Sequence, residues 1–139
     1  MKAERTFFVQ EIIKRKTNMK LRGPDHPIII APNGNRVRVT FDGVLIADTT
    51  RALTLKEASY PPVQYIPRAD AKMDLLMSTA NATHCPYKGD ANYFSISTGG
   101  RTAENAVWSY EQPFPAMAEI KEYLAFYPNR VDKIEETSP

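Results

Sequence analysis

The chain's one cysteine, Cys85, precedes Lys88 by three residues within the stretch THCPYKGDANYF at residues 83–94. A thiolate is nucleophilic near neutral pH when a nearby cation or backbone N–H groups stabilise it. Lys88 would supply that cation, and a turn at residues 87–89 would direct N–H groups toward the sulfur. His84 is poorly placed as a base, because neighbours on a strand point to opposite faces. Alternatively, Cys85 is a buried structural residue that packs as a small apolar side chain.

Glu57 is a second candidate, because it continues an apolar strand face. The period of two in RALTLKE places Leu53, Leu55 and Glu57 on one side. A carboxylate there costs free energy unless it is paired or protonated, and Lys88 is a suitable partner. The two groups would form an acid/base pair, orient a polar ligand or make a purely structural ion pair. The alternative is that the strand ends at Lys56 and that Glu57 turns toward water.

Aromatic residues concentrate in the same part of the chain, and such side chains line small-molecule pockets by stacking and by donating hydrogen bonds. Trp108 and Tyr110 share a strand face by their spacing. We expect the ligand-binding residues to come from Tyr65, Tyr87, Tyr93, Trp108 and Tyr110, with Glu57, Lys88 and Cys85 as the catalytic candidates.

Several standard sites are missing from the sequence. It has no glycine-rich phosphate loop, no H-E-x-x-H, no G-x-S-x-G and no C-x-x-C motif. One cysteine and two histidines offer few ligands for a structural metal. We therefore expect no metal and no cofactor.

Short β-strands separated by turns account for most of the expected elements. From Gly23 onward, Pro and Gly punctuate short runs rich in Val, Ile, Thr, Phe and Tyr, a pattern typical of an antiparallel β domain. In RVRVTFDGVLIAD, Asp42-Gly43 predicts a two-residue type I′ turn. That turn predicts the cross-strand pairs Phe41 with Val44, Val39 with Ile46, and Val37 with Asp48.

Two helices and three segments complete the expected architecture. We predict a short N-terminal amphipathic helix over residues 4–16 and a C-terminal helix over PAMAEIKEYLAFY, which Pro128 ends. The overall prediction is a mainly β fold in which residues 1–22 are a basic N-terminal segment that we expect to be helical. Residues 23–132 form a single compact domain of short antiparallel, coiled sheets, and residues 133–139 form a disordered tail.

Composition limits the classes of function. The 139 residues, 42% hydrophobic and 24% charged, suit one globular domain, and no apolar run approaches a membrane span. The start of the chain lacks the pattern of a signal peptide, so we expect a cytoplasmic protein. Residues 1–22 carry seven Lys or Arg and two Glu. This basic segment is either a solvated surface or a site for phosphate groups.

The order of several motifs resembles a known family, the domain of unknown function 427, which is catalogued as nucleotidyltransferase-like. The resemblance covers about residues 26–132 and rests on HPIII, RVRVTFDGVLIADT, LKEASYPPVQYIPRAD, THCPYKGDANYFS, AVWSYEQP and YLAFYPNRVD. It implies a single antiparallel β domain with few helices, and its label hints at nucleotide binding. The family pattern falls on Glu57, Tyr60, Tyr65, Pro67, Cys85, Pro86, Lys88, Gly89, Tyr93, Trp108 and Tyr110.

Three functions remain open at this point. The leading hypothesis is a small-molecule-binding β domain with a polar and aromatic pocket for an anionic or nucleotide-like ligand. The second is an enzyme that uses Glu57 and Lys88 as acid and base, or Cys85 as a thiol. The third is a protein or nucleic-acid interaction module that uses the basic segment, although a small-molecule partner is preferred to nucleic acid or membrane. The oligomeric state is not determined by the sequence.

Overall fold

Ten strands and three 3-10 turns make up residues 26–139, the part of the chain that this computed structural model describes. The strands are β1 (Ile28–Asn33), β2 (Arg36–Phe41), β3 (Val44–Thr49), β4 (Ala52–Glu57), β5 (Val63–Tyr65), β6 (Leu76–Cys85), β7 (Gly89–Ser97), β8 (Thr102–Ser109), β9 (Leu124–Phe126) and β10 (Lys133–Thr137). The turns are η1 (Arg68–Asp70), η2 (Met73–Leu75) and η3 (Pro115–Ile120).

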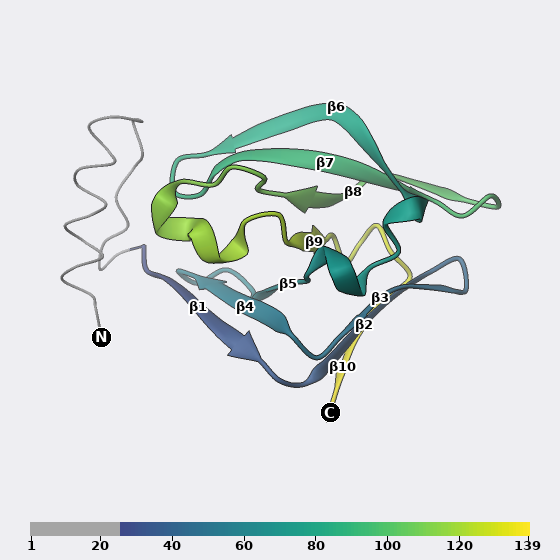
Figure 1. Cartoon of the computed structure of the whole chain (residues 1–139), viewed down its shortest axis with the longest axis horizontal. Coiled ribbons are helices and arrows are strands. Elements are labelled where there is room, and N and C mark those ends of the chain that lie inside the picture. The colour runs from purple at the N-terminus through teal and green to yellow at the C-terminus, as the bar shows by residue number, and fades with distance from the viewer. Residues whose placement is uncertain (1–25) are drawn as a thin grey trace.

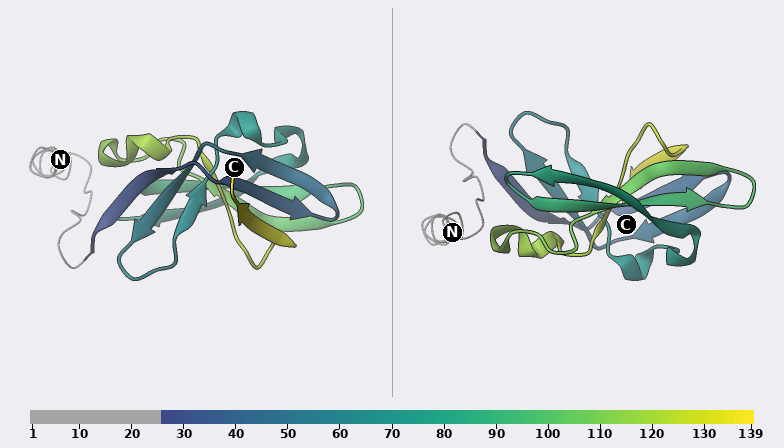
Figure 2. Two further views of the ribbon diagram at one scale, coloured as in Figure 1. Left: turned by 90° about the horizontal axis from the view of Figure 1, so that it is seen from below. Right: turned by 90° about the horizontal axis from the view of Figure 1, so that it is seen from above.

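The strands form three antiparallel sheets, with the orders β1-β4-β5, β10-β2-β3 and β6-β7-β8-β9. In Figure 1 the long strands of the four-stranded sheet lie above the two smaller sheets. Figure 2 shows the same layers from below and from above. The predicted mainly β fold of small antiparallel sheets is confirmed. None of the helical segments within residues 26–139 has the length and apolar character needed to cross a bilayer.

The hairpin at Asp42-Gly43 forms as expected, but its register was predicted only in part. Both turn residues have positive φ, 55° and 72°, as a type I′ turn requires. Phe41 pairs with Val44, whereas Val39 pairs with Ala47, not with Ile46. An irregularity between Val39 and Thr40 shifts the register, so Val37 also faces Thr49 and not Asp48.

Two apolar clusters fill the space between the sheets. One lies mainly between β2, β3, β7 and β8 and includes the fully buried Val37, Val39 and Ile96. The other gathers residues of β1, β4, β5, β7, η3 and β9 together with the residue that follows β8, namely Ile28, Leu55, Tyr65, Ala91, Tyr93, Tyr110, Met117, Ile120 and Ala125. The second cluster has several tyrosines, so polar hydroxyl groups are built into an otherwise apolar interior.

The predicted C-terminal helix was wrong. Residues 115–120 form only the 3-10 turn η3, which is kinked at Met117, and Glu122 adopts a φ of 66° that ends any helical path. The chain then forms β9, in which Ala125 pairs with Trp108 of β8. Leu124 also exchanges two backbone hydrogen bonds with Ile66, of 2.7 and 2.8 Å. These long-range bonds, absent from any local pattern, join the four-stranded sheet to the end of β5 and outweigh the helical spacing.

The prediction of a disordered tail over residues 133–139 was also wrong, because Lys133–Thr137 form β10 and pair with β2. Glu136 accepts hydrogen bonds from Asn33 at 3.0 Å and Asn35 at 2.9 Å. The predicted N-terminal helix and the basic segment lie outside the described residues.

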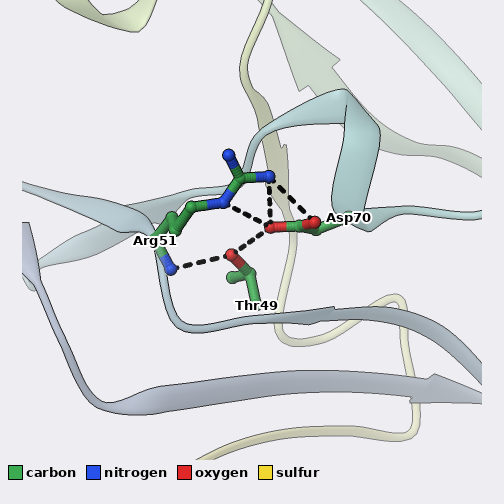
Figure 3. A network of polar contacts seen from close by, with 3 residues as sticks. All are labelled: Thr49, Arg51 and Asp70. Atoms are coloured by element: carbon green, nitrogen blue, oxygen red, sulfur yellow. Dashed lines mark hydrogen bonds and ion pairs between the residues drawn. The ribbon is translucent and has the colours of Figure 1, made fainter.

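A polar network fixes the segment that follows β5. Asp70, in η1, accepts a hydrogen bond of 2.7 Å from Thr49 and three hydrogen bonds from Arg51, one from Nε and two from Nη2 (Figure 3). The Thr49 hydroxyl in turn accepts the backbone N–H of Arg51. Hydrogen bonds from Arg51, only partly opposed by burial, lower the pKa of Asp70. The network ties η1 to the β3–β4 connection and thereby holds the start of the second half of the chain.

Candidate functional site

A cavity of about 210 Å³ opens beside the second apolar cluster. Its lining comes from β4, the β4–β5 connection, β5, the β6–β7 turn, β7, β8 and the residues that follow β8 and β9. The lining residues are Leu55, Glu57, Tyr60, Pro61, Val63, Tyr65, Lys88, Tyr93, Trp108, Tyr110 and Tyr127. Six of the eight side chains named from the sequence as site candidates therefore line one cavity.

Glu57 and Lys88 form an ion pair in this cavity. The Nζ atom of Lys88 lies 2.5 Å from Oε1 of Glu57, and the two side chains are only 9% and 16% exposed. The other carboxylate oxygen, Oε2, lies 2.7 Å from Nε2 of His26. Because an ionised carboxylate only accepts hydrogen bonds, both Lys88 and His26 donate to Glu57. Both oxygens of Glu57 are thus engaged.

The pairing fixes the charge state of Glu57. Burial alone would raise the pKa of Glu57, but the hydrogen bonds from Lys88 and His26 outweigh it and hold the pKa below the ordinary value of 4.5. Glu57 is therefore ionised at neutral pH. The arrangement makes Glu57 an anchor for its two donors, in contrast to a carboxyl group with a raised pKa that stores a proton.

Strand pairing explains why His26 reaches Glu57. Ile28 pairs with Glu57 at the start of β1, and the N–H of Ala58 donates to the carbonyl of Pro27 at 2.8 Å. The chain before β1 therefore runs alongside the end of β4. The His26 ring stacks on Tyr87, with centroids 3.9 Å apart and planes 8° from parallel, which fixes its orientation.

A tight turn between β6 and β7 holds Lys88. The Lys88 carbonyl accepts the N–H of Phe114 at 3.0 Å, so the turn is fastened to the segment before η3. The next residue, Gly89, has a φ of 113° and leaves little space, since a Cβ atom there would lie 3.3 Å from the Phe114 nitrogen. The positive φ favours glycine at this position, and the tight contact with the Phe114 backbone adds to that preference.

Aromatic side chains make up much of the remaining wall. The indole N–H of Trp108 donates to the Tyr65 hydroxyl at 3.2 Å, and the Trp108 ring lies 4.5 Å from that of Tyr127. Tyr93 bonds to the Tyr127 hydroxyl at 3.2 Å and to Thr83 at 2.9 Å. These contacts lock the rings in place, so the wall is organised before any ligand arrives.

Tyr110 differs from its neighbours. Its side chain is buried, and burial, the largest effect, raises the pKa of its hydroxyl far above the ordinary value. Within residues 26–139 no hydrogen-bond partner reaches that hydroxyl. Lys88 also has N–H groups without a partner, because its ammonium group bonds only to Glu57 among the described residues. The cavity thus has N–H and O–H donors to spare, while its carboxylate is already satisfied.

Two of the residues named from the sequence do not line the cavity. Cys85 is half-buried and packs against the second apolar cluster, and Tyr87 packs there while stacking on His26. Conversely, His26 and Tyr127 belong to the site but were not selected from the sequence. Nothing local marks His26, whose role depends on the β1–β4 pairing. Tyr127 was assigned to a helix, and only the correct assignment of β9 would have placed it here.

Residues 26–139 contain no group of three or more His, Cys, Asp or Glu side chains arranged to hold a metal ion. The donors that line the cavity include the Lys88 ammonium group and tyrosine hydroxyls, and such groups recognise ligands with acceptor oxygens.

Comparison with known proteins gives one finding. A family model described as "Domain of unknown function (DUF427)" matches residues 29–137. No curated protein matches the chain closely enough to count as a relative.

Proposed function

Since the chain belongs to the DUF427 family, whose description carries no activity, we propose its function from the cavity. The protein binds a small planar molecule and recognises an acceptor oxygen of that molecule. Lys88 donates to that oxygen while Glu57 holds the ammonium group in place. The observation that carries the proposal is a lysine side chain only 9% exposed, with N–H groups left over, inside an aromatic cavity.

The size of the cavity narrows the ligand class. A cavity of about 150 Å³ holds benzene, whereas drug-sized ligands occupy about 300–1,000 Å³. At about 210 Å³ the cavity suits a single ring with a carboxylate, carbonyl or similar group, which is the size of a nucleobase and smaller than a nucleotide. Tyr60 lines the cavity and is exposed to solvent, so in this proposal it covers the outer side of the bound ring.

The polar groups of the cavity favour a ligand that accepts hydrogen bonds over one that donates them. Both oxygens of Glu57 are occupied, while Lys88 and Tyr110 retain donors. A carboxylate ligand gains charge attraction from Lys88 but is repelled by Glu57, and a neutral carbonyl avoids that repulsion. The two head groups share the same acceptor chemistry, and experiment distinguishes them.

Titration by nuclear magnetic resonance with benzoate and with benzamide tests the proposal. At roughly 0.5 kcal/mol per non-hydrogen atom, probes of this size should bind with Kd values of about 1 mM. Lys88→Met should weaken the better probe at least tenfold. Lys56→Met is the matched control, because Lys56 is the exposed neighbour of Glu57 on the other face of β4, and it should bind like the wild type.

Binding that is equal in the Lys88→Met and Lys56→Met variants would show that the cavity lysine is not the recognition group. Absence of binding by both probes to the wild type would refute the proposal as a whole. Each variant is first shown to be folded, by the dispersion of its amide resonances.

A further inference from the structure

A second cavity, of about 260 Å³, lies directly beside the first. The two cavities share Val63 and Trp108 in their linings, so those two side chains form the partition between them. The second cavity extends toward the β10-β2-β3 sheet, where Ile134 of β10 is 36% exposed at its edge.

The chemistry of the second cavity is different from that of the first. Its floor is made by the buried Val37, Val39, Ile66 and Phe126. No charged side chain lines it within residues 26–139. Its one amide, Gln64, already accepts hydrogen bonds from Asn33 at 3.0 Å and from Thr54 at 2.8 Å. Apart from the Gln64 amide, the indole N–H of Trp108 and backbone groups, the lining of the second cavity is apolar.

From this juxtaposition we infer that the ligand is amphipathic, with a planar polar head at Lys88 and a short apolar tail that passes the Val63–Trp108 partition into the second cavity. The inference rests on the proposed function, since the head is the molecule proposed above. Transfer of an apolar tail from water into such a cavity is favourable, whereas a charged substituent would lose its hydration there without a charged partner among the described residues.

The partition is suited to admit a tail. Val63 and Trp108 are both partly exposed, in contrast to the fully buried floor residues. Trp108 is held by Tyr65 through its indole N–H, so its ring edge is fixed. Val63 lies in β5, a strand of three residues at the edge of its sheet, and pairs with Leu55. In the proposed complex, Val63 is therefore the side of the partition that shifts to admit the tail.

The test compares benzoate and benzamide with their 4-butyl derivatives. Each methylene transferred from water contributes about fourfold in affinity, so a tail that is only partly buried should still strengthen binding of the better head at least tenfold. Nuclear Overhauser effects from the butyl protons to the methyl groups of Val39 and Ile66 should accompany the gain, since these residues line the second cavity alone.

Variants separate a specific site from nonspecific adsorption of an alkyl chain. Ile134→Glu places a charge at the edge of the second cavity, so it should abolish the gain from the butyl group and leave parent benzoate or benzamide binding unchanged. Ile29→Glu is the matched control, because Ile29 is 61% exposed and lines neither cavity, and it should retain the gain.

The outcomes distinguish this inference from the proposed function. If the parent probes bind through Lys88 but the butyl group adds less than threefold, the tail inference is wrong and the proposed function stands. The tail inference is equally wrong if the gain persists in Ile134→Glu, because the alkyl chain then binds elsewhere. If neither parent probe binds through Lys88, both ideas fall together.

Discussion

Replacing Lys88 by methionine is expected to destabilise the domain by about 3 kcal/mol, because the change leaves Glu57 ionised in a poorly hydrated place. The two charges lie 2.5 Å apart at their closest atoms, and their side chains are 9% and 16% exposed. With an effective dielectric constant near 20, charges about 3 Å apart attract by about 5 kcal/mol. His26 remains as a donor to Glu57 and limits the loss, so the expected cost lies at the low end of the range of about 3–5 kcal/mol for a broken buried pair.

The double variant Glu57→Gln/Lys88→Met carries the sharper information. It removes both charges and keeps the volumes similar, so it should cost about 1 kcal/mol, less than Lys88→Met alone. Urea unfolding at pH 7 provides the measurement, followed by the fluorescence of Trp108, the one tryptophan in the chain, which lines the same cavity. The slope of the free energy of unfolding against urea concentration must be the same in all variants for the comparison to hold.

Lys56→Met serves as the control, and as an exposed substitution it should fall within about 0.5 kcal/mol of the wild type. Two results would refute the reasoning. One is a cost below about 1 kcal/mol for Lys88→Met, which would place the pair in water. The other is a double variant whose cost equals the sum of the single variants, which would show that Glu57 and Lys88 do not interact.

Further predictions concern pH and the turn after Lys88. Because the folded-state pKa of Glu57 lies below 4.5, its contribution to stability is present above that pH and is lost as the pH falls below it. The difference in the free energy of unfolding between wild type and Glu57→Gln, measured in urea, should therefore shrink from pH 7 to pH 3. Burial and the hydrogen bond with Tyr93 raise the pKa of Tyr127 to about 12, so the stability it contributes is complete below about pH 10 and is lost toward pH 12. The measurement is the difference in phenolate absorbance between wild type and Tyr127→Phe, because the chain has seven tyrosines; a difference that appears before unfolding begins would contradict this. Gly89→Ala should cost about 1–3 kcal/mol in thermal unfolding, whereas Gly34→Ala, which has open space, should be nearly neutral.

Local patterns predicted those parts of the fold that depend on neighbours in sequence. The Asp42-Gly43 turn followed from its residue types, and the alternation in β4 correctly placed Glu57 beside Leu55 in one cavity lining. The register beyond the turn did not follow, because the irregularity after Val39 has no mark in the residue types.

The features that were not predicted from the sequence depend on pairing between residues far apart in the chain. The stretch after Pro115 has helical spacing, yet Leu124 bonds to Ile66 and Ala125 pairs with Trp108, partners far away in sequence. The same dependence kept His26 from being predicted, since only the register of β1 with β4 brings it to Glu57. Residue types thus indicated six of the side chains that line the cavity, and tertiary pairing brought them together with His26 and Tyr127.

The position of strand β10 near the end of the chain affects when its sheet can be completed during synthesis. It completes its sheet by pairing with β2, and the bond between Asn35 and Glu136 joins residues 101 positions apart. During translation, one edge of β2 therefore stays unpaired until residues 133–137 have left the ribosome. A nascent chain stalled or cleaved before that point would present an open strand edge next to the apolar Val37 and Val39, the kind of surface that chaperones bind and that seeds aggregation.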